Sequence, residues 1–267
     1  MRVTLLGTGH VFAIHDAVRR AVLDRQPNVV CLELDPNRLA ALRQKDAHRK
    51  AGREPKQATR ADAPFAYRFL ARFQERIASS YDVDVGGEML AALEAAEQLR
   101  VPIACIDVDS VHLIRRVWRE MPWRERFRLG GAMLQGMFTR KRGVEDEVAT
   151  FEKDPGAYLA LVGQQFPTAK RVLIDDRDHH MATGILRAAQ VKGDVVAVVG
   201  DGHVGGIEER LRKVPGLDLE VIRLKQIREG KVPTAPPRAQ PFSIAASPGE
   251  ARASLSTEWR GPEYEVD

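Results

Sequence analysis

The 267-residue chain is poor in cysteine, with only Cys31 and Cys105, and both lie inside apolar runs. They predict buried free thiols in a reducing compartment, and they argue against a disulfide framework or a zinc cluster built from cysteine. No run approaches the roughly 18–20 apolar residues that a membrane-spanning helix needs. The N-terminus starts like a strand and has no long apolar signal core. We therefore expect a cytoplasmic protein without a transmembrane span.

A strong charge of one sign is also missing. The 41 basic and 37 acidic residues leave a formal net charge of +4, which does not indicate a nucleic-acid partner. Basic residues concentrate in two stretches, at 43–60 and at 115–142, and aromatic residues interleave the second. The first stretch predicts a solvated insertion. The second predicts an amphipathic helical pair, with weak contact to a membrane surface or an anionic partner as the alternative.

Several common catalytic signatures are absent: a Gly-Lys-Ser/Thr phosphate loop, a Gly-x-Ser-x-Gly elbow and a Cys-x-x-Cys pair. Gly7-Thr8-Gly9, followed by an acidic residue at 33 or 35, imitates a dinucleotide-binding fingerprint. Phe12 stands where the third glycine belongs. The fingerprint is therefore broken.

Short apolar runs alternate with segments of helical periodicity. Strands are expected at 3–6, 29–34, 103–106, 172–174, 195–199 and 219–224, and helices include 65–80, 111–140, 144–162 and 178–190. This alternation predicts an α/β fold with a largely parallel central sheet and helices on both faces. We expect one domain at 1–232, with a basic loop insertion at about 43–63, and a flexible Pro-rich tail at 233–267.

Two segments of the chain are similar to each other. Residues 3–11 and 197–204 are each an apolar strand that ends in Gly-x-Gly-His-Val. The similarity suggests two related halves, or at least two equivalent strand ends. Ligands of parallel sheets bind beyond the carboxyl ends of the strands, so polar residues that follow the strands are expected to share one rim. These residues are His10, Glu33, Asp35, Asp107, Asp109, Asp175 to Asp178, and His203.

Two imidazoles and a carboxylate with one open position can form a hydrolytic metal centre. The same groups without metal can form a His–Glu pair that activates water. Glu33 lies in an apolar run, where a carboxylate is costly unless it is paired, although it could simply cap a helix. Arg38 falls in a first helical turn, which disfavours a cation and hints at an anionic partner. Arg177 lies between two aspartates and is either an ion-pair member or a substrate clamp.

Four motifs carry a resemblance to a known family. They are Leu6-Gly7-Thr8-Gly9-His10-Val11 with Val30-Cys31-Leu32-Glu33-Leu34-Asp35 and Arg38; Gly86-Gly87-Glu88-Met89 with Ile106-Asp107-Val108-Asp109; Leu173-Ile174-Asp175-Asp176-Arg177-Asp178 with Met181-Ala182; and Val198-Val199-Gly200-Asp201-Gly202-His203-Val204-Gly205-Gly206-Ile207. In this order, over about residues 3–224, the chain resembles the TraB/PrgY (pheromone-shutdown) family. That family is similar to Tiki metalloproteases and, more remotely, to ChaN-like and erythromycin-esterase proteins.

The resemblance implies a shared α/β fold with two histidine motifs and a glutamate at the site, here His10, His203 and Glu33. The chain departs from the family at Asp107-Val108-Asp109, where the family usually has Asp-Arg-Asp. It also lacks the C-terminal membrane spans of many microbial members. Our leading hypothesis is a hydrolase of peptide or amide bonds that uses a divalent metal ion of the Mn, Co or Zn class.

In this hypothesis His10 and His203 bind the metal, and Glu33 is a ligand or the base. Glu88 and Asp107 orient the imidazoles, and Arg38 or Arg177 binds the substrate. The substrate is a peptide or a small molecule. Two alternatives remain open: a metal-independent His/Glu hydrolase of esters or lactones, and a non-enzymatic protein that binds a peptide pheromone.

Overall fold

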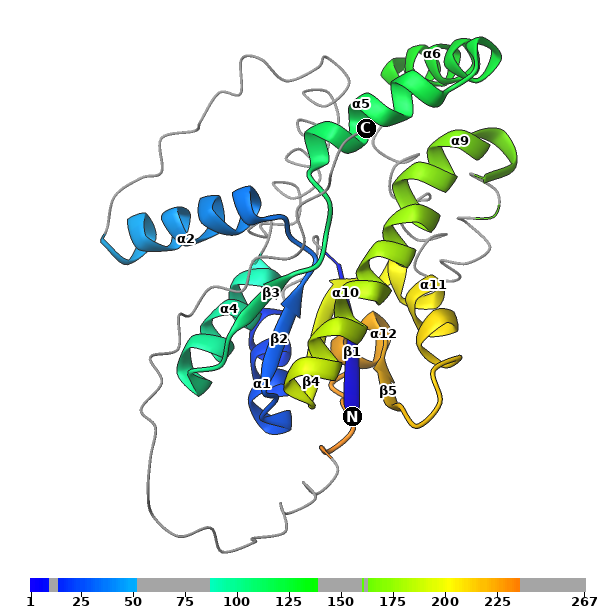
Figure 1. Ribbon diagram of the computed structural model, residues 1–267. Coiled ribbons are helices and arrows are strands. Elements are labelled where there is room, and N and C mark those ends of the chain that lie inside the picture. Colours follow the sequence, from blue (N-terminus) through cyan, green and yellow to red (C-terminus); the bar gives the residue numbers. More distant parts are fainter. Residues whose placement is uncertain (10–13, 52–86, 139–159, 161–162, 236–267) are drawn as a thin grey trace, which may run out of the picture.

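The computed structural model describes residues 1–9, 14–51, 87–138, 160 and 163–235, with side chains in the helix at 123–138 only as far as Gly131. In this part of the chain five parallel strands form one sheet in the order β3-β2-β4-β1-β5 (Figure 1). The strands are β1 (Arg2–Thr8), β2 (Val29–Leu32), β3 (Ile103–Cys105), β4 (Val195–Gly200) and β5 (Asp218–Ile222). The predicted α/β fold with a parallel sheet is confirmed.

Helices cover both faces of the sheet because successive strand residues point to opposite sides. Leu6 belongs to a core cluster with α1 (His15–Arg25), α4 (Gly87–Leu99) and α12 (Leu224–Arg228). Its neighbour Leu5 belongs to a second cluster with α10 (Asp176–Lys192) and α11 (Asp201–Leu211) on the other face. Strands buried on both faces explain the nearly uninterrupted apolar runs in the sequence.

The chain leaves two neighbouring strands in opposite directions at the centre of the sheet. β1 pairs with β4, with Thr8 opposite Gly200, yet β1 leads into α1 on one face and β4 into α11 on the other. This is a topological switch point, where open α/β sheets bind ligands. The two Gly-x-Gly-His-Val motifs begin at these adjacent strand ends. Whether the chain consists of two related halves stays a prediction.

The strand predicted at 172–174 is wrong, because these residues form a helix. α9 (Pro167–Lys170), the π-helical turn η1 (Arg171–Asp175) and α10 follow one another without a break. Val172 is buried with Val117 and Met121 in a small core away from the sheet. A short apolar run does not distinguish a buried strand from one buried side of a helix.

The first part of the predicted basic loop is also helical. α2 (Pro36–Lys50) includes residues 43–50, and Asp46 pairs with Arg49 and Lys50 along the helix, while Arg49 also reaches Glu94 of α4. Such pairs, three and four residues apart, support a helix that has little apolar surface. Residues 52–63, the expected helix at 65–80, most of 144–162 and the tail from residue 236 lie outside the described residues.

The helical pair predicted for the second basic stretch is confirmed as far as the described residues extend, as α5 (Ser110–Glu120) and α6 (Trp123–Phe138). Pro122 separates them, since proline disfavours helical backbone in the residue before it. The capping role expected of Asp35 is confirmed, because its side chain accepts the backbone N–H of Arg38 at the start of α2. None of the described helices is long and apolar enough to cross a membrane.

Candidate active site at the carboxyl ends of the strands

His203 and Asp178 form a buried pair between α10 and α11. Nδ1 of His203 lies 2.6 Å from Oδ1 of Asp178, and neither side chain is more than 9% exposed. Burial raises the pKa of Asp178 above its ordinary value, although the hydrogen bond with His203 acts in the opposite direction. The pair fixes the orientation of the imidazole, so that its other nitrogen, Nε2, faces the rim of the sheet.

Arg177 selects the tautomer of His203. Its Nη1 lies 3.0 Å from Nε2 of His203, and a guanidinium can only donate hydrogen bonds. Nε2 must therefore be the acceptor, and the ring proton of the neutral imidazole is on Nδ1, where it donates to Asp178. An imidazole in this tautomer presents a lone pair to the site, as a general base or a metal ligand requires.

All five N–H groups of Arg177 have partners. Nε and Nη2 donate to the two oxygens of Asp107 at 2.9 and 2.8 Å, and Nη2 also donates to Oε1 of Glu33 at 2.6 Å. Nη1 donates to the carbonyl of Leu173 at 3.2 Å as well as to His203. Burial opposes the charge of Arg177, but the hydrogen bonds that Arg177 donates to Asp107 and the charge of Glu33 outweigh it and raise the pKa of Arg177.

Glu33 connects the ends of β2 and β4. Its Oε2 accepts the backbone N–H of Gly200 at 2.6 Å, where α11 begins, and its Oε1 lies 3.5 Å from Nε2 of His203. The positive end of the helix dipole and the guanidinium of Arg177 together compensate the buried carboxylate. Glu33 therefore caps a helix, as the structural alternative predicted, and also faces the imidazole.

Arg38 approaches the same cluster from α2. Its Nη1 lies 3.1 Å from Oδ2 of Asp107, whose side chain is 2% exposed, whereas the side chain of Arg38 is 33% exposed. Asp107 thus holds two arginines, one enclosed and one open to solvent. Its neighbour Asp109 has a structural role, since it accepts the first backbone N–H groups of α5.

Gly206 makes room for the carboxylate behind His203. A Cβ on Gly206 would lie 1.9 Å from Oδ2 of Asp178, far inside van der Waals contact. A Cβ on the next residue towards the N-terminus, Gly205, would meet no atom within 4 Å. The Gly-Gly that follows the second histidine motif therefore has one position that the site requires and one that it does not.

Gly7 has a similar relation to Asp201. A Cβ on Gly7 would lie 2.2 Å from Oδ1 of Asp201, whose side chain crosses the end of β1 to reach Arg223 after β5. Asp201 also accepts the backbone N–H of Leu224 at the start of α12. The first glycine of the motif at 7–9 is thus explained by packing, without a bound nucleotide.

Five of the predicted site residues come together in one cluster: Glu33, Arg38, Asp107, Arg177 and His203. His10 lies outside the described residues, one residue beyond Gly9, and Glu88 is buried in the first turn of α4. Asp178 was among the residues expected at the rim, but the sequence analysis gave it no role in the site. In the sequence it lies in a run of charges that reads as the exposed end of a helix, and only the packing of α10 on α11 brings it to His203.

The identity of the donor atoms fits a divalent metal ion in part. A neutral imidazole backed by a carboxylate, 3.5 Å from a second carboxylate, is the arrangement that metal-ligating histidines commonly have. Within the described residues, however, no group of three or more His, Cys, Asp or Glu side chains could hold a metal. Arg177 contacts both Glu33 Oε1 and His203 Nε2, so ligation by these atoms requires the guanidinium to withdraw from His203.

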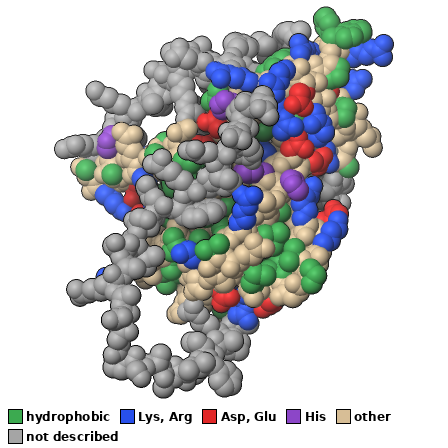
Figure 2. Space-filling view, viewed as in Figure 1, with side chains coloured by type: hydrophobic (Ala, Val, Ile, Leu, Met, Phe, Trp, Pro, Cys, Tyr) green, Lys and Arg blue, Asp and Glu red, His purple; other side chains and the backbone are tan. Residues whose placement is uncertain are grey.

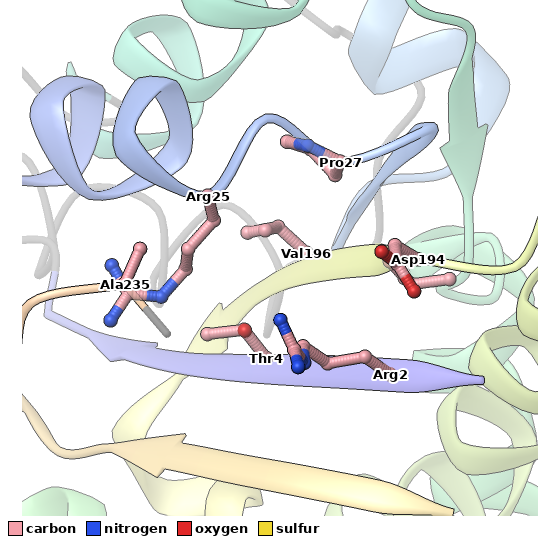
Figure 3. Close-up of a pocket in the computed structure, with 8 residues that line it drawn as sticks. Arg2, Thr4, Arg25, Pro27, Asp194, Val196 and Ala235 are labelled. Atoms are coloured by element: carbon pink, nitrogen blue, oxygen red, sulfur yellow. The ribbon is translucent and has the colours of Figure 1, made fainter. Parts of the chain in front are cut away.

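A small pocket lies at the opposite edge of the sheet, near the amino ends of the strands. Figure 3 shows Thr4, Arg25 and Val196 on its wall. Two of its polar side chains are paired within the protein, since Thr4 donates to Glu220 and Arg25 binds both oxygens of Glu220. The candidate site remains the rim at the carboxyl ends, where the predicted site residues gather.

The fold and this rim define a parallel α/β protein with a His–Asp–Glu–Arg cluster at the switch point. The matching family model identifies the class more closely, because the model of the TraB/PrgY/gumN family covers residues 1–215. The chain belongs to the TraB/PrgY/gumN family.

The chain is similar to "Uncharacterized protein MJ1365" of Methanocaldococcus jannaschii, with 28% identity over 231 residues. This similarity covers 86% of the chain but only 58% of that relative, so the chain spans less than two thirds of the relative's length. The kinship with Tiki-type and ChaN-like proteins stays a prediction.

Proposed function

We propose that this protein is a hydrolase of peptide or amide bonds whose centre is the cluster of Glu33, Asp178 and His203. The observation that carries the proposal is the 3.5 Å approach of Glu33 Oε1 to the unprotonated Nε2 of His203, held from behind by Asp178. Both groups can accept a proton from water, and both lie where parallel sheets bind their ligands.

Each residue of the cluster has a distinct part in this proposal. Glu33 takes the proton of the attacking water and returns it to the leaving nitrogen as the C–N bond breaks, and Asp178 holds His203 in the tautomer that presents its lone pair. Arg177 fixes Glu33 and Asp107, since all its N–H groups are engaged. Arg38 is the cation with solvent access, so it binds the substrate carboxylate or the oxyanion. Arg177 can share that role only after it releases His203.

His10 and His203 would hold the divalent metal ion, and Glu33 would be either a third ligand or the base. When bound, a metal of the Mn, Co or Zn class polarises the scissile carbonyl and makes water a stronger acid. Asp107 and Glu88 would then orient the ligands without binding the metal, and Asp107 would do so through Arg177. The proposal assigns no role to any other residue of the rim.

A direct test measures cleavage products and metal content together. The full chain is incubated with a mixture of synthetic peptides and with Mn²⁺, Co²⁺ or Zn²⁺, and products are identified by mass spectrometry. We expect cleavage in the wild type and its loss in Glu33→Gln and His203→Ala. His112→Ala is the matched control, because His112 is exposed on α5. Elemental analysis should find about one metal per chain, lost in a double variant of His10 and His203.

The contacts of Arg177 favour a second candidate, a metal-independent hydrolase of esters or lactones. A guanidinium already supplies positive charge to Glu33 and His203 at 2.6 and 3.0 Å. In this case turnover of an ester substrate would resist chelators, and purified protein would contain no metal. Peptide affinity without any product, with each metal added, would instead identify a non-enzymatic binder and overturn both hydrolase proposals.

A further inference from the structure

The first turns of α6 carry two exposed aromatic side chains. Trp123 and Phe127 are 64% and 76% exposed, and their rings pack edge to face with centroids 6.0 Å apart. Residues four apart lie on one side of a helix. Glu125, on the other side, is buried and accepts two backbone N–H groups of α9. α6 is therefore anchored by its inner side and presents the aromatic side outward.

The space beside the two aromatic rings is open. A Cβ built on Gly130 or Gly131, one turn further along α6, would meet no atom within 4 Å. In Figure 1, α5 and α6 extend away from the sheet.

Arginines are frequent in α5 and in the first turns of α6, and they have few acidic partners. Residues 110–131 contain six arginines and two glutamates, a net charge of +4 that equals that of the whole chain. Among the described residues, Arg115 and Arg119 of α5 make no ion pair, and Arg124 stacks on Trp123 at 5.3 Å. Figure 2 shows apolar and basic side chains side by side at this end of the molecule.

We propose that the Trp123/Phe127 side of α6, with Arg115, Arg119 and Arg124, is a docking surface for an anionic lipid bilayer. Aromatic side chains favour the boundary between headgroups and acyl chains, and arginines bind the phosphates above it. A projecting helix end suits a fluid surface, which needs no matching groove. The proposal is independent of the chemistry at the rim of the sheet.

The test uses the full chain and sedimentation with vesicles. Binding is expected to vesicles of phosphatidylcholine with phosphatidylserine, and not to phosphatidylcholine alone, and to fall steeply at about 0.5 M salt. Trp123→Ala with Phe127→Ala should weaken binding roughly tenfold or more. Charge reversal to Glu at the three arginines should abolish it, since each arginine contributes about fivefold.

Matched controls separate this surface from general effects. Val191→Ala removes an exposed apolar side chain of α10, and reversal to Glu at Arg20, Arg187 and Lys225 changes the net charge by the same amount. Both should bind as the wild type does. A variant with Trp118→Phe and Trp259→Phe retains Trp123 and leaves the proposed docking surface unchanged. The fluorescence emission of Trp123 should shift to the blue when anionic vesicles are added.

Three outcomes would overturn the proposal. One is wild-type binding by the Trp123/Phe127 double variant, and another is the absence of binding to anionic vesicles at low salt. In the third, the wild type forms a dimer in sedimentation velocity and does not bind vesicles, whereas the double variant is a monomer. That result would assign the surface to self-association.

Discussion

Oδ1 of Asp178 lies 2.6 Å from Nδ1 of His203, and the hydrogen bond joins α10 and α11, the two helices on either side of β4 in the chain. This contact fixes both the tautomer and the direction of the imidazole. The proposed hydrolase therefore depends on Asp178 even though Asp178 contacts no substrate.

Asp178→Asn should lower activity or metal affinity by about 10- to 100-fold, because the amide is a weaker acceptor and can hold the wrong tautomer. Asp176→Asn, two residues earlier in α10 and partly exposed, is the control and should remain near wild type. The measurements are kcat, KM and metal affinity by titration. A loss of thermal stability with unchanged kinetics would show that Asp178 is only structural.

Gly206→Ala should displace Asp178, since the added Cβ would lie 1.9 Å from its carboxylate. We expect destabilisation of about 1–3 kcal/mol in urea unfolding, together with loss of activity. Gly205→Ala, which meets open space, should retain activity and unfold at the same urea concentration or higher. Equal behaviour of the two variants would contradict the close approach of α10 and α11.

Arg177→Met should destabilise the fold by about 3–5 kcal/mol, because it leaves Glu33 and Asp107 buried without their shared counter-ion. Arg171→Met removes an arginine that is 46% exposed and should cost less than about 1 kcal/mol. Chemical unfolding of both variants gives the comparison. A small effect at Arg177 would mean that another cation compensates the two carboxylates.

The two thiols should be inert in the native protein. Burial raises the pKa of Cys31 to about 12 and that of Cys105 to about 11, so neither is a thiolate near pH 8. Ellman's reagent should label two thiols only after denaturation. Rapid labelling of the native chain would place a thiol at the surface.

The same thiols make stability depend on pH in the alkaline range. Their native pKa values lie above the ordinary value of 9.0, so the folded state binds more protons than the unfolded chain. This contribution is complete below about pH 9 and is lost as the pH rises towards 11 or 12. Cys31→Ala should therefore show a shallower loss of unfolding free energy above pH 9 than the wild type.

The sequence by itself determined the architecture and most of the rim. Apolar runs that are buried on both faces indicate a parallel sheet, and the polar residues that follow them, such as Glu33 and Asp107, must then meet at one edge. Asp35 before Pro36 marks the start of a helix through local backbone chemistry alone. Each of these signals depends on residues that are close in the sequence, so it can be recognised without knowing which residues are close in space.

Only the tertiary structure decided which groups hold one another. Val172 is buried by α5 and not by a sheet, and no local pattern distinguishes the two environments. Asp178 acquires its partner because Gly206 lets α10 approach α11, and Arg177 becomes a buried clamp because two distant carboxylates converge on it. Such pairings depend on how the helices and strands pack against one another, and no short stretch of sequence reveals that packing.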